Sequence, residues 1–459
     1  MKSNAVNITE IVSGYQYRFK PNAFLIDSKR TFAKLKSKGL LNCIVSDYCS
    51  DIFRPGIFKR IFVKDLNHGK IYLTAQAMVT EDPRRMAKIL STKLTDNLEP
   101  MILNKNGILV SCAGTVGNIR LISKSMDCTV GSQDIIRVIP KEYFGFVYAY
   151  LSSNTVYDYL QSQIYGSVVH RIEPETVSTI PVPDFTLDVI NKVEELIRTS
   201  SQLRDEAIEA LDKAKEILSK YLNVSFKKEY FKTSVVSSKD IWNSLQHRLD
   251  PPAIMNDGVY SMQDITSKMN HTTIANINGK VYRPGIFKRN YVSNGIPYIK
   301  GSEIFLTNPF RRCEQLSRTL TPFIDEMSMK EGQILITCAG SVGDIKLITK
   351  EYEDKKSIGS QDIIRLESDD ELYTKEYLFV YLQQPFVYDY IQSMKYGSVI
   401  ERIEPFHVES IPVIEPTKEL SNEITSIVRH YMDCTYQAFK CEEKAISMVE
   451  EEIEKWNKN

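Results

Sequence analysis

Two long segments of the chain carry apolar or small residues at alternating spacings of four and three. One segment begins near Val189 and the other near Leu420. This spacing is the heptad pattern of a helix that packs along one stripe, and it predicts two helices of about 30 residues, each about 45 Å long. The second stripe repeats the first 231 positions later, as Val193 and Ile424 show. The positions expected to pack on the stripes are Val193, Leu196, Leu203, Ala207 and Ala214, then Ile424, Ile427, Tyr431, Ala438 and Ala445.

The narrow stripe favours pairing of the two helices with each other. A helix that lies on a globular core usually shows a broader apolar face. An antiparallel pair would place the domains that precede the helices at opposite ends and relate them by a pseudo-twofold axis. The other interpretation, in which each helix packs on its own domain, stays open.

The segments between the two long helices predict a mixed α/β fold. Four short apolar runs read as strands, and glycine-containing turns follow two of them. Residues 143–164 and 377–394 carry Tyr and Leu at helix-like spacings, so each is expected to form one helix packed on a sheet. The strand-like runs are Ile108–Cys112, Asn118–Ile122, Ile334–Cys338 and Asp344–Ile348.

The two halves of the chain repeat each other. The sequence FRPGIFKR at Phe53–Arg60 returns as YRPGIFKR at Tyr282–Arg289, and GSQDIIR at Gly131–Arg137 returns at Gly359–Arg365. An offset of about 230 residues is too long for a solenoid repeat and indicates a duplicated domain. The organisation expected is a globular domain at 1–186, a helix at 187–223, a second globular domain at 224–416 and a second helix at 417–459.

Composition fits a globular protein that acts inside the cell. The chain has 459 residues, of which 42% are hydrophobic and 25% charged, enough to bury two cores. No apolar run of about 18 residues is present, so neither a membrane protein nor a secreted one is indicated, and a cytoplasmic location is expected. The cysteines form no Cys-x-x-Cys pair, and Cys112 and Cys338 end apolar strands, so buried reduced thiols are expected.

Charge is distributed unevenly although the net charge is zero. Residues 1–120 carry about ten more Lys and Arg than Asp and Glu, and the last forty residues have an acidic excess of about three. A basic region of this kind can neutralise phosphates, but charge runs also form ordinary solvated surfaces. Charge alone therefore leaves a nucleic-acid role open.

Motifs for catalysis and metal binding are incomplete. Asp250–Pro252 begins like a methyltransferase motif, but Ala253 stands where an aromatic residue is needed to stack on a flipped base, so a turn is expected there. Gly114–Gly117 and Gly340–Gly343 lack the further residues of a phosphate loop and read as tight turns. The six histidines are scattered, and no metal site is predicted.

Taken together, the chain resembles the DNA-specificity (S) subunit of type I restriction-modification enzymes. The resemblance rests on the order of domain, long helix, domain, long helix. The motifs that carry it are Gly295–Ile304, the Gly-x-Val-Gly turns, the stretches from Tyr-Gly-Ser to Ile-Pro that end at Ser178–Pro181 and Ser410–Pro412, and Arg248–Asp250. It implies two target recognition domains that each read one half of a split double-stranded DNA site. The helices would form an antiparallel coiled coil that sets the distance between the half-sites and docks two methyltransferase subunits. A restriction (motor nuclease) subunit would join them.

That resemblance also implies a chain without catalysis or cofactors of its own. S-adenosylmethionine, ATP and Mg²⁺ would be held by the partner subunits. Gln76–Met78 in the first domain stands where the second has Ser302–Ile304, so the two domains are expected to read different half-sites.

Candidate DNA contacts fall into two groups. Basic residues shared by both halves suit phosphates, because readers of different half-sites should differ, whereas basic residues in stretches that differ suit bases, since Arg binds guanine in a bidentate manner. The shared group is Arg54, Lys59, Arg60, Arg283, Lys288 and Arg289. The differing group, for which a solvated surface is the alternative, is Arg84, Arg85, Lys88, Arg311 and Arg312.

Two functions of different classes remain in view. One is a non-catalytic subunit that reads DNA and depends on partners for chemistry. The other is a duplicated scaffold that holds two partner subunits without reading DNA. Salt-dependent binding to a split DNA site would favour the first, and salt-insensitive protein binding without DNA affinity the second.

Overall fold

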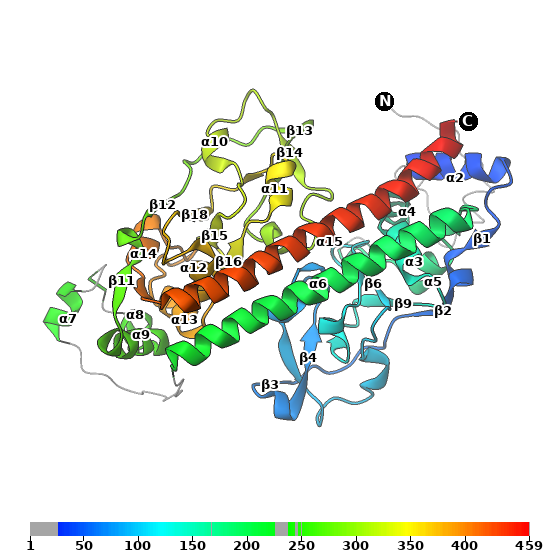
Figure 1. Ribbon diagram of the computed structural model, residues 1–459. Helices are drawn as coiled ribbons and strands as arrows, with labels where there is room; N and C mark the ends of the chain where they lie inside the picture. Colours follow the sequence, from blue (N-terminus) through cyan, green and yellow to red (C-terminus); the bar gives the residue numbers. More distant parts are fainter. Residues whose placement is uncertain (1–25, 167, 225–236, 244–246, 249, 459) are drawn as a thin grey trace. The chain divides into compact units, whose positions relative to one another are not determined.

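The computed structural model describes residues 26–166, 168–224, 237–243, 247–248 and 250–458 (Figure 1). The chain divides into two compact units. Unit 1 comprises Met1–Asp205 and Gln437–Asn459, and unit 2 comprises Glu206–Tyr436. Each unit contains helices and sheets, which confirms the mixed α/β class. Each unit also contains one part of each long helix, so the units do not end where the globular segments end.

The main sheet of unit 1 is antiparallel and has four strands in the order β2-β9-β6-β7. Every residue of the central strand β6 is buried, as expected for its continuous apolar run. The strands are β2 (Cys49–Phe53), β6 (Ile108–Ser111), β7 (Ile119–Leu121) and β9 (Ile135–Pro140). Strands β6 and β7 correspond to the strands predicted from the sequence at 108–112 and 118–122.

A second sheet of unit 1 has the order β3-β5-β4-β8, in which β4 and β8 run parallel. A short antiparallel pair, β1 with β10, lies at the entry to the long helix. The strands are β1 (Cys43–Ile44), β3 (Phe62–Val63), β4 (Gly69–Leu73), β5 (Lys88–Ser91), β8 (Val130–Gly131) and β10 (Pro181–Val182).

Unit 2 repeats these sheets. Its main sheet has the order β12-β18-β15-β16, its second sheet β14-β13-β17, and β11 pairs with β19. In unit 2 the single strand β13 takes the place of the two strands β3 and β4 of unit 1. Its register with β14 is irregular between Tyr291 and Ile296. The strands are β11 (His271–Thr273), β12 (Gly279–Tyr282), β13 (Tyr291–Ile299), β14 (Glu314–Leu316), β15 (Ile334–Thr337), β16 (Ile345–Leu347), β17 (Ile358–Gly359), β18 (Ile363–Ser368) and β19 (Pro412–Ile414).

The helices predicted as single elements at 143–164 and 377–394 are each broken in two. Ser153 is extended and its hydroxyl accepts a hydrogen bond from the Val156 amide, so it caps a new helix. Pro385 opens the second helix in unit 2, because proline fits the first turn and not the interior of a helix. The four helices are α3 (Phe144–Ser152), α4 (Asn154–Ser162), α12 (Lys375–Leu382) and α13 (Pro385–Ser393).

Shorter helices complete both units. The turn expected at Asp250–Pro252 is instead the start of α8, where Asp250 precedes the helix and Pro251 opens it. The remaining α-helices are α2 (Asp27–Ser37), α5 (Pro174–Ser178), α7 (Ser238–Asn243), α8 (Pro251–Ile254), α9 (Asp257–Lys268), α10 (Ile324–Met327), α11 (Lys350–Asp354) and α14 (Pro405–Glu409). Among the described residues, no helix is both long enough and apolar enough to cross a membrane.

The two long helices are α6 (Leu187–Leu222), with 36 residues, and α15 (Lys418–Lys458), with 41. Both exceed the predicted length. Within unit 1 the ring of Phe185, just before α6, lies 5.0 Å from that of Trp456, and the Ser200 hydroxyl donates to the Ala438 carbonyl at 2.7 Å. From Phe185 to Ser200 the residue number rises, while their partners fall from Trp456 to Ala438. The helix segments of unit 1 therefore run antiparallel (Figure 1).

The apolar face of α6 is broader than the predicted stripe. Val193 on the stripe is buried, but so is Ile197 beside it, whereas Leu196 is only partly buried. Val193 and Ile197 belong to the same core cluster as residues of the main sheet and Val449 of α15. In unit 1 the helix therefore packs on α15 and on the globular core together, so both of the interpretations left open by the sequence apply there. Other buried stripe positions are Ala207, Ala214, Ile424, Tyr431, Ala438 and Ala445, while Leu203 and Ile427 are partly exposed.

Candidate nucleic-acid interface

Two loops of unit 1 are joined at their bases. The first loop follows β2 and begins at Arg54; the second is a hairpin whose ends, Tyr165 and Arg171, form an isolated β-bridge. Glu173 joins them, because its carboxylate pairs with the Arg54 guanidinium at 3.3 Å and accepts a hydrogen bond from the Tyr165 hydroxyl. We call residues 54–61 and 165–171 the loop pair of unit 1.

Unit 2 builds the same arrangement with the matching residues. Arg283 and Glu404 lie 3.3 Å apart, and the Tyr396 hydroxyl donates to Glu404 at 2.8 Å. Arg402 closes the hairpin with Tyr396. The loop pair of unit 2 is residues 283–290 and 396–402. Since an Arg–carboxylate pair that is partly shielded from water holds its geometry better than an exposed one, these residues fix how each hairpin leaves its sheet.

Each hairpin needs the glycine that follows its tyrosine. Gly166 has φ +92°, and a Cβ there would lie 2.2 Å from the carbonyl oxygen of Val169. Gly397 has φ +98°, and its Cβ would lie 2.5 Å from the carbonyl oxygen of Ile400. Left-handed backbone and this close approach both exclude larger residues. Ser167, which follows Gly166 in the repeated motif, lies outside the described residues.

The loop tips expose apolar side chains in both units. Val168 and Val399, at the hairpin tips, are 93% and 92% exposed, and Ile57 and Ile286, in the partner loops, are 90% and 77% exposed. Large apolar side chains that recur at matching exposed positions mark a contact surface more than chance exposure does. Sequence reasoning missed these residues, although the repetition of Gly-Ser-Val and Pro-Gly-Ile in both halves was the signal that identifies them.

The shared basic residues differ in their surroundings. Arg54 and Arg283 lie at the bases of the loops, half-buried and paired with glutamates. Arg289 is also engaged: its Nε donates to the Tyr298 hydroxyl at 2.8 Å. Lys59, Arg60 and Lys288 are exposed. The structure thus brings three exposed cations and three tethered ones to the loop pairs.

Two cysteines lie behind the loop pairs. Arg54 hydrogen-bonds the thiol of Cys112, and burial raises the pKa of that thiol to about 11 despite the nearby positive charge. Arg283 Nη1 lies 3.9 Å from Cys338 Sγ, and burial again raises the thiol pKa. Both thiols are fully buried and stay protonated at neutral pH, as expected for unreactive cysteines.

Buried arginines hold the repeated Gly-Ser-Gln-Asp turns. Arg137 donates to the carbonyl oxygens of Gly131 and Ser132 at 2.6 and 2.8 Å, and Arg365 donates to those of Gly359 and Ile363 at 3.0 and 2.9 Å. Burial lowers the pKa of each to about 10, so both guanidinium groups remain charged. Both side chains are fully buried, and their role is to order backbone.

The candidates for base reading lie on the second sheets or in the turns that lead into them. Arg84 is clamped to Asp82 by two bonds of 2.8 and 2.9 Å, and Arg85 beside it is exposed. Lys88 lies on β5 with its ammonium over the Phe62 ring. Arg311 and Arg312 follow a turn in which the Asn308 side chain accepts from the Arg311 amide at 3.2 Å.

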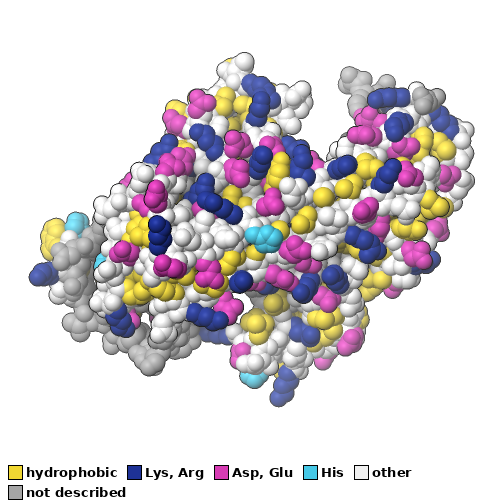
Figure 2. Space-filling view, viewed as in Figure 1, with side chains coloured by type: hydrophobic (Ala, Val, Ile, Leu, Met, Phe, Trp, Pro, Cys, Tyr) yellow, Lys and Arg dark blue, Asp and Glu magenta, His cyan; other side chains and the backbone are white. Residues whose placement is uncertain are grey.

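The register identifies matching positions on these sheets. Tyr72 pairs with Lys88 and Val130, and Tyr298 pairs with Glu314 and Ile358. Lys88 of unit 1 and Glu314 of unit 2 therefore occupy the same place with opposite charge, and Glu314 is paired with Lys300 at 2.8 Å. On the face shown in Figure 2, basic and acidic side chains are intermixed and do not form one basic patch.

Comparison with known proteins identifies the domain that carries this arrangement. Residues 269–444 match the family described as "Type I restriction modification DNA specificity domain". This stretch of the chain is therefore similar to a type I restriction-modification DNA specificity domain. The match covers β13, β14, both loops of the unit 2 loop pair and much of α15, and it confirms the resemblance seen in the sequence.

Solved structures of this family are similar to the chain over most of its length, at low identity. The type I S subunit from M. genitalium is 12% identical and covers 91% of this chain and 96% of its own, with a TM-score of 0.35. The HsdS subunit from Thermoanaerobacter tengcongensis is 13% identical and covers 89% and 95%, with a TM-score of 0.28. No curated protein matches the sequence.

Proposed function

We propose that this chain is the DNA sequence-specificity subunit of a type I restriction-modification complex. In this proposal, residues 1–186 and 224–416 are two target recognition domains that read the two halves of a split site in double-stranded DNA. Residues 187–223 and 417–459 form an antiparallel coiled coil with pseudo-twofold symmetry that sets the distance between the half-sites. The chain acts in the cytoplasm without catalysis or a cofactor of its own.

The observation that carries the proposal is the repetition of a matched domain. The specificity family covers residues 269–444, and the first half of the chain repeats its motifs and its sheet order. Two copies of a DNA specificity domain in one chain suit a target with two halves. The opposite charges of Lys88 and Glu314 at one register position support half-sites of different sequence.

The partners follow from the same proposal. Two methyltransferase subunits dock on the helices, and a restriction (motor) subunit completes the complex. S-adenosylmethionine, ATP and Mg²⁺ belong to those partners. Within the chain, Lys59, Arg60 and Lys288 are exposed beside the loop tips and suit phosphate contact, whereas the tethered Arg54 and Arg283 position the loops.

Methylation mapping tests this function directly. Genomic DNA is mapped from cells that express the chain with its cognate methyltransferase subunit and from cells that lack only this chain. The expected result is one split motif, with a fixed gap of roughly one helical turn or less, that is absent without the chain. A motif that persists without the chain would contradict DNA reading and would favour the duplicated scaffold.

Point variants separate phosphate contact from loop structure. Replacing both Lys59 and Arg60 with Ala should weaken DNA binding at all sequences and reduce the salt dependence by about one to two phosphate contacts. Lys330→Ala, an exposed lysine outside the loop pairs, is the matched control. Equal affinities and salt slopes for the two proteins would exclude phosphate contact by the loop pair of unit 1.

A further inference from the structure

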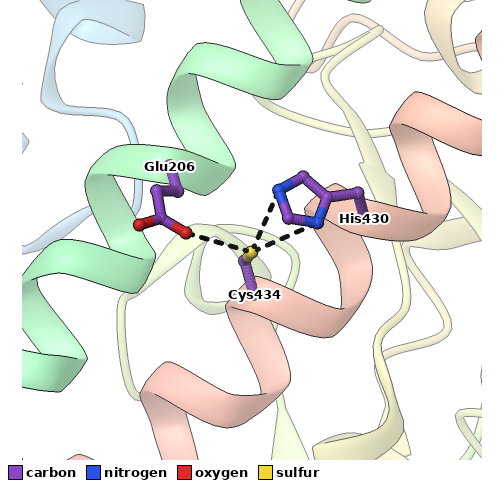
Figure 3. A group of neighbouring side chains, drawn as sticks. All are labelled: Glu206, His430 and Cys434. Atoms are coloured by element: carbon purple, nitrogen blue, oxygen red, sulfur yellow. Dashed lines mark hydrogen bonds between the residues drawn. The ribbon is translucent and has the colours of Figure 1, made fainter.

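Three side chains with metal-binding atoms meet between the long helices of unit 2. Glu206 projects from α6, and His430 and Cys434 project from α15 toward it (Figure 3). The Cys434 sulfur lies 3.7 and 3.6 Å from the two ring nitrogens of His430 and 4.0 Å from Oε2 of Glu206. One ligand atom from each residue lies within 4.8 Å of the others.

The spacing of these atoms fits a tetrahedral ion. With Zn–S about 2.3 Å and Zn–N or Zn–O about 2.0 Å, the ligand atoms of a tetrahedral site lie about 3.5 Å apart. His430 and Cys434 are four positions apart on one helix, so their side chains share a face. Glu206 Oε2 lies 4.0 Å from Cys434 Sγ, and the three ligand atoms lie within 4.8 Å of one another, so the Glu206 carboxylate must move toward the other two ligands to reach the tetrahedral spacing.

We propose that Glu206, His430 and Cys434 form a zinc-binding site that links α6 to α15 in unit 2. A thiolate with an imidazole selects a borderline or soft ion such as Zn²⁺ over Mg²⁺ or Ca²⁺, which prefer oxygen ligands alone. Three protein ligands leave a fourth position for water, and the exposed His430 ring leaves that side open to solvent. The proposal is independent of DNA reading.

Binding of the ion requires one proton to leave. A free cysteine thiol has a pKa of about 8.5 and is mostly protonated at neutral pH before the ion arrives. On binding, the S–H bond is broken, the proton passes to solvent and a Zn–S bond forms. Cys434 is 2% exposed, whereas His430 is exposed, so the ion enters from the His430 side.

Only unit 2 has this site among the described residues. At the offset of 231, the positions that match His430 and Cys434 are Thr199 and Leu203, and Glu206 matches Gln437. None of these is a zinc ligand of the usual kind. The expectation of no metal site was drawn from histidines scattered along the sequence, whereas Glu206 and Cys434 lie more than two hundred residues apart and meet on one helix pair.

The site is tested on the full-length protein treated with a chelator and then titrated with Zn²⁺ and with Co²⁺. The expected result is one equivalent bound, with a sulfur-to-cobalt charge-transfer band, and a higher unfolding temperature with Zn²⁺. Cys434→Ser and His430→Ala should each lose at least tenfold in affinity and lose or weaken the charge-transfer band. Cys441→Ser is the matched control, because it removes a thiol seven positions further along α15.

The outcomes decide the proposal. No stoichiometric binding by the unmodified protein, or equal affinity after Cys434→Ser, would overturn it. A loss of binding in Cys441→Ser equal to that in Cys434→Ser would also count against it, since the loss would then not be specific to the Cys434 thiol. If Cys434→Ser does not fold, His430→Ala, at an exposed position, carries the same test.

Discussion

The two units differ most where the long helices meet their globular parts. In unit 1 the mostly buried Arg204 pairs with Glu442 at 2.8 Å, and the Tyr148 hydroxyl donates to the same carboxylate at 3.0 Å. At the offset of 231, unit 2 has Thr435, Leu211 and Phe379 at these positions. A polar network in one copy is thus replaced by largely apolar packing in the other.

The loop pairs, in contrast, are joined by matching residues and contacts in both units. Both units keep the arginine, glutamate and tyrosine that join the loops, together with the exposed apolar tips. A duplicated fold can exchange a buried polar network for apolar packing without changing its backbone, because packing density and shape are what the core requires. The comparison indicates that the loop pairs are kept for what they contact and that the helix contacts are free to diverge.

The largest expected effect comes from breaking the network of unit 1. Glu442→Leu leaves the Arg204 guanidinium buried without its partner and should lower the free energy of unfolding by about 3–5 kcal/mol. The double variant with Arg204→Thr, which installs the residues of unit 2 at two of the three positions, should regain most of that loss. Urea unfolding followed by the fluorescence of Trp456, which packs on the core of unit 1 while Trp242 is exposed, measures it.

Glu451→Ala, at an exposed position on the same helix, is the control and should change stability by less than about 0.5 kcal/mol. A double variant no more stable than Glu442→Leu would show that the two units do not share interchangeable packing.

A smaller effect is expected in the loop pairs. Gly397→Ala meets both a left-handed backbone and the Ile400 carbonyl, and it should destabilise the hairpin of unit 2 by about 2 kcal/mol. Gly340→Ala, at φ +77° with nothing within 4 Å of its Cβ, should cost about 1 kcal/mol. Hydrogen exchange of the Tyr396 amide, which is bonded to Arg402 at 3.0 Å, reports the difference; equal exchange in both variants would contradict the close approach.

Acid should weaken unit 2 through His407, which unit 1 replaces with Thr176. Burial lowers the pKa of His407, although the negative charge of the nearby Glu404 carboxylate opposes the shift. His407 therefore binds a proton less readily in the folded state than in the unfolded state. Its contribution to the free energy of unfolding is highest above pH 6.5, the ordinary pKa of histidine, and falls as the pH drops below that value. His407→Thr should flatten this dependence in urea unfolding between pH 5 and pH 8; an unchanged slope would place its origin elsewhere.

The smallest effect on stability is expected from exchanging charge on the second sheets. Lys88→Glu gives unit 1 the charge of unit 2 and, at an exposed position, should change the free energy of unfolding by less than about 0.5 kcal/mol. If the proposed function holds, methylation mapping should show an altered first half-site and an unchanged second one. Glu314→Lys should do the reverse, and a change in both half-sites from either variant would contradict separate reading.

The sequence by itself determined the elements whose signal is local or repeated. The stripes at Val193 and Ile424 located both long helices, the apolar runs located β6 and β15, and the repeated motifs located the segments that form the loop pairs. Periodicity and repetition are properties of neighbouring or matching positions, so they need no three-dimensional information. The family resemblance drew on the same motifs.

Only the tertiary structure decided how these segments combine. The pairing of Arg54 with Glu173, the meeting of Glu206 with Cys434, and the packing of Ile197 on the core each join residues brought together by folding. The breaks at Ser153 and Pro385 followed from a cap and a proline, which outweighed the apolar spacing around them. Charge and periodicity along the chain say which residues are available, whereas burial and proximity, which depend on the whole fold, decide whether an arginine holds a loop or faces a phosphate.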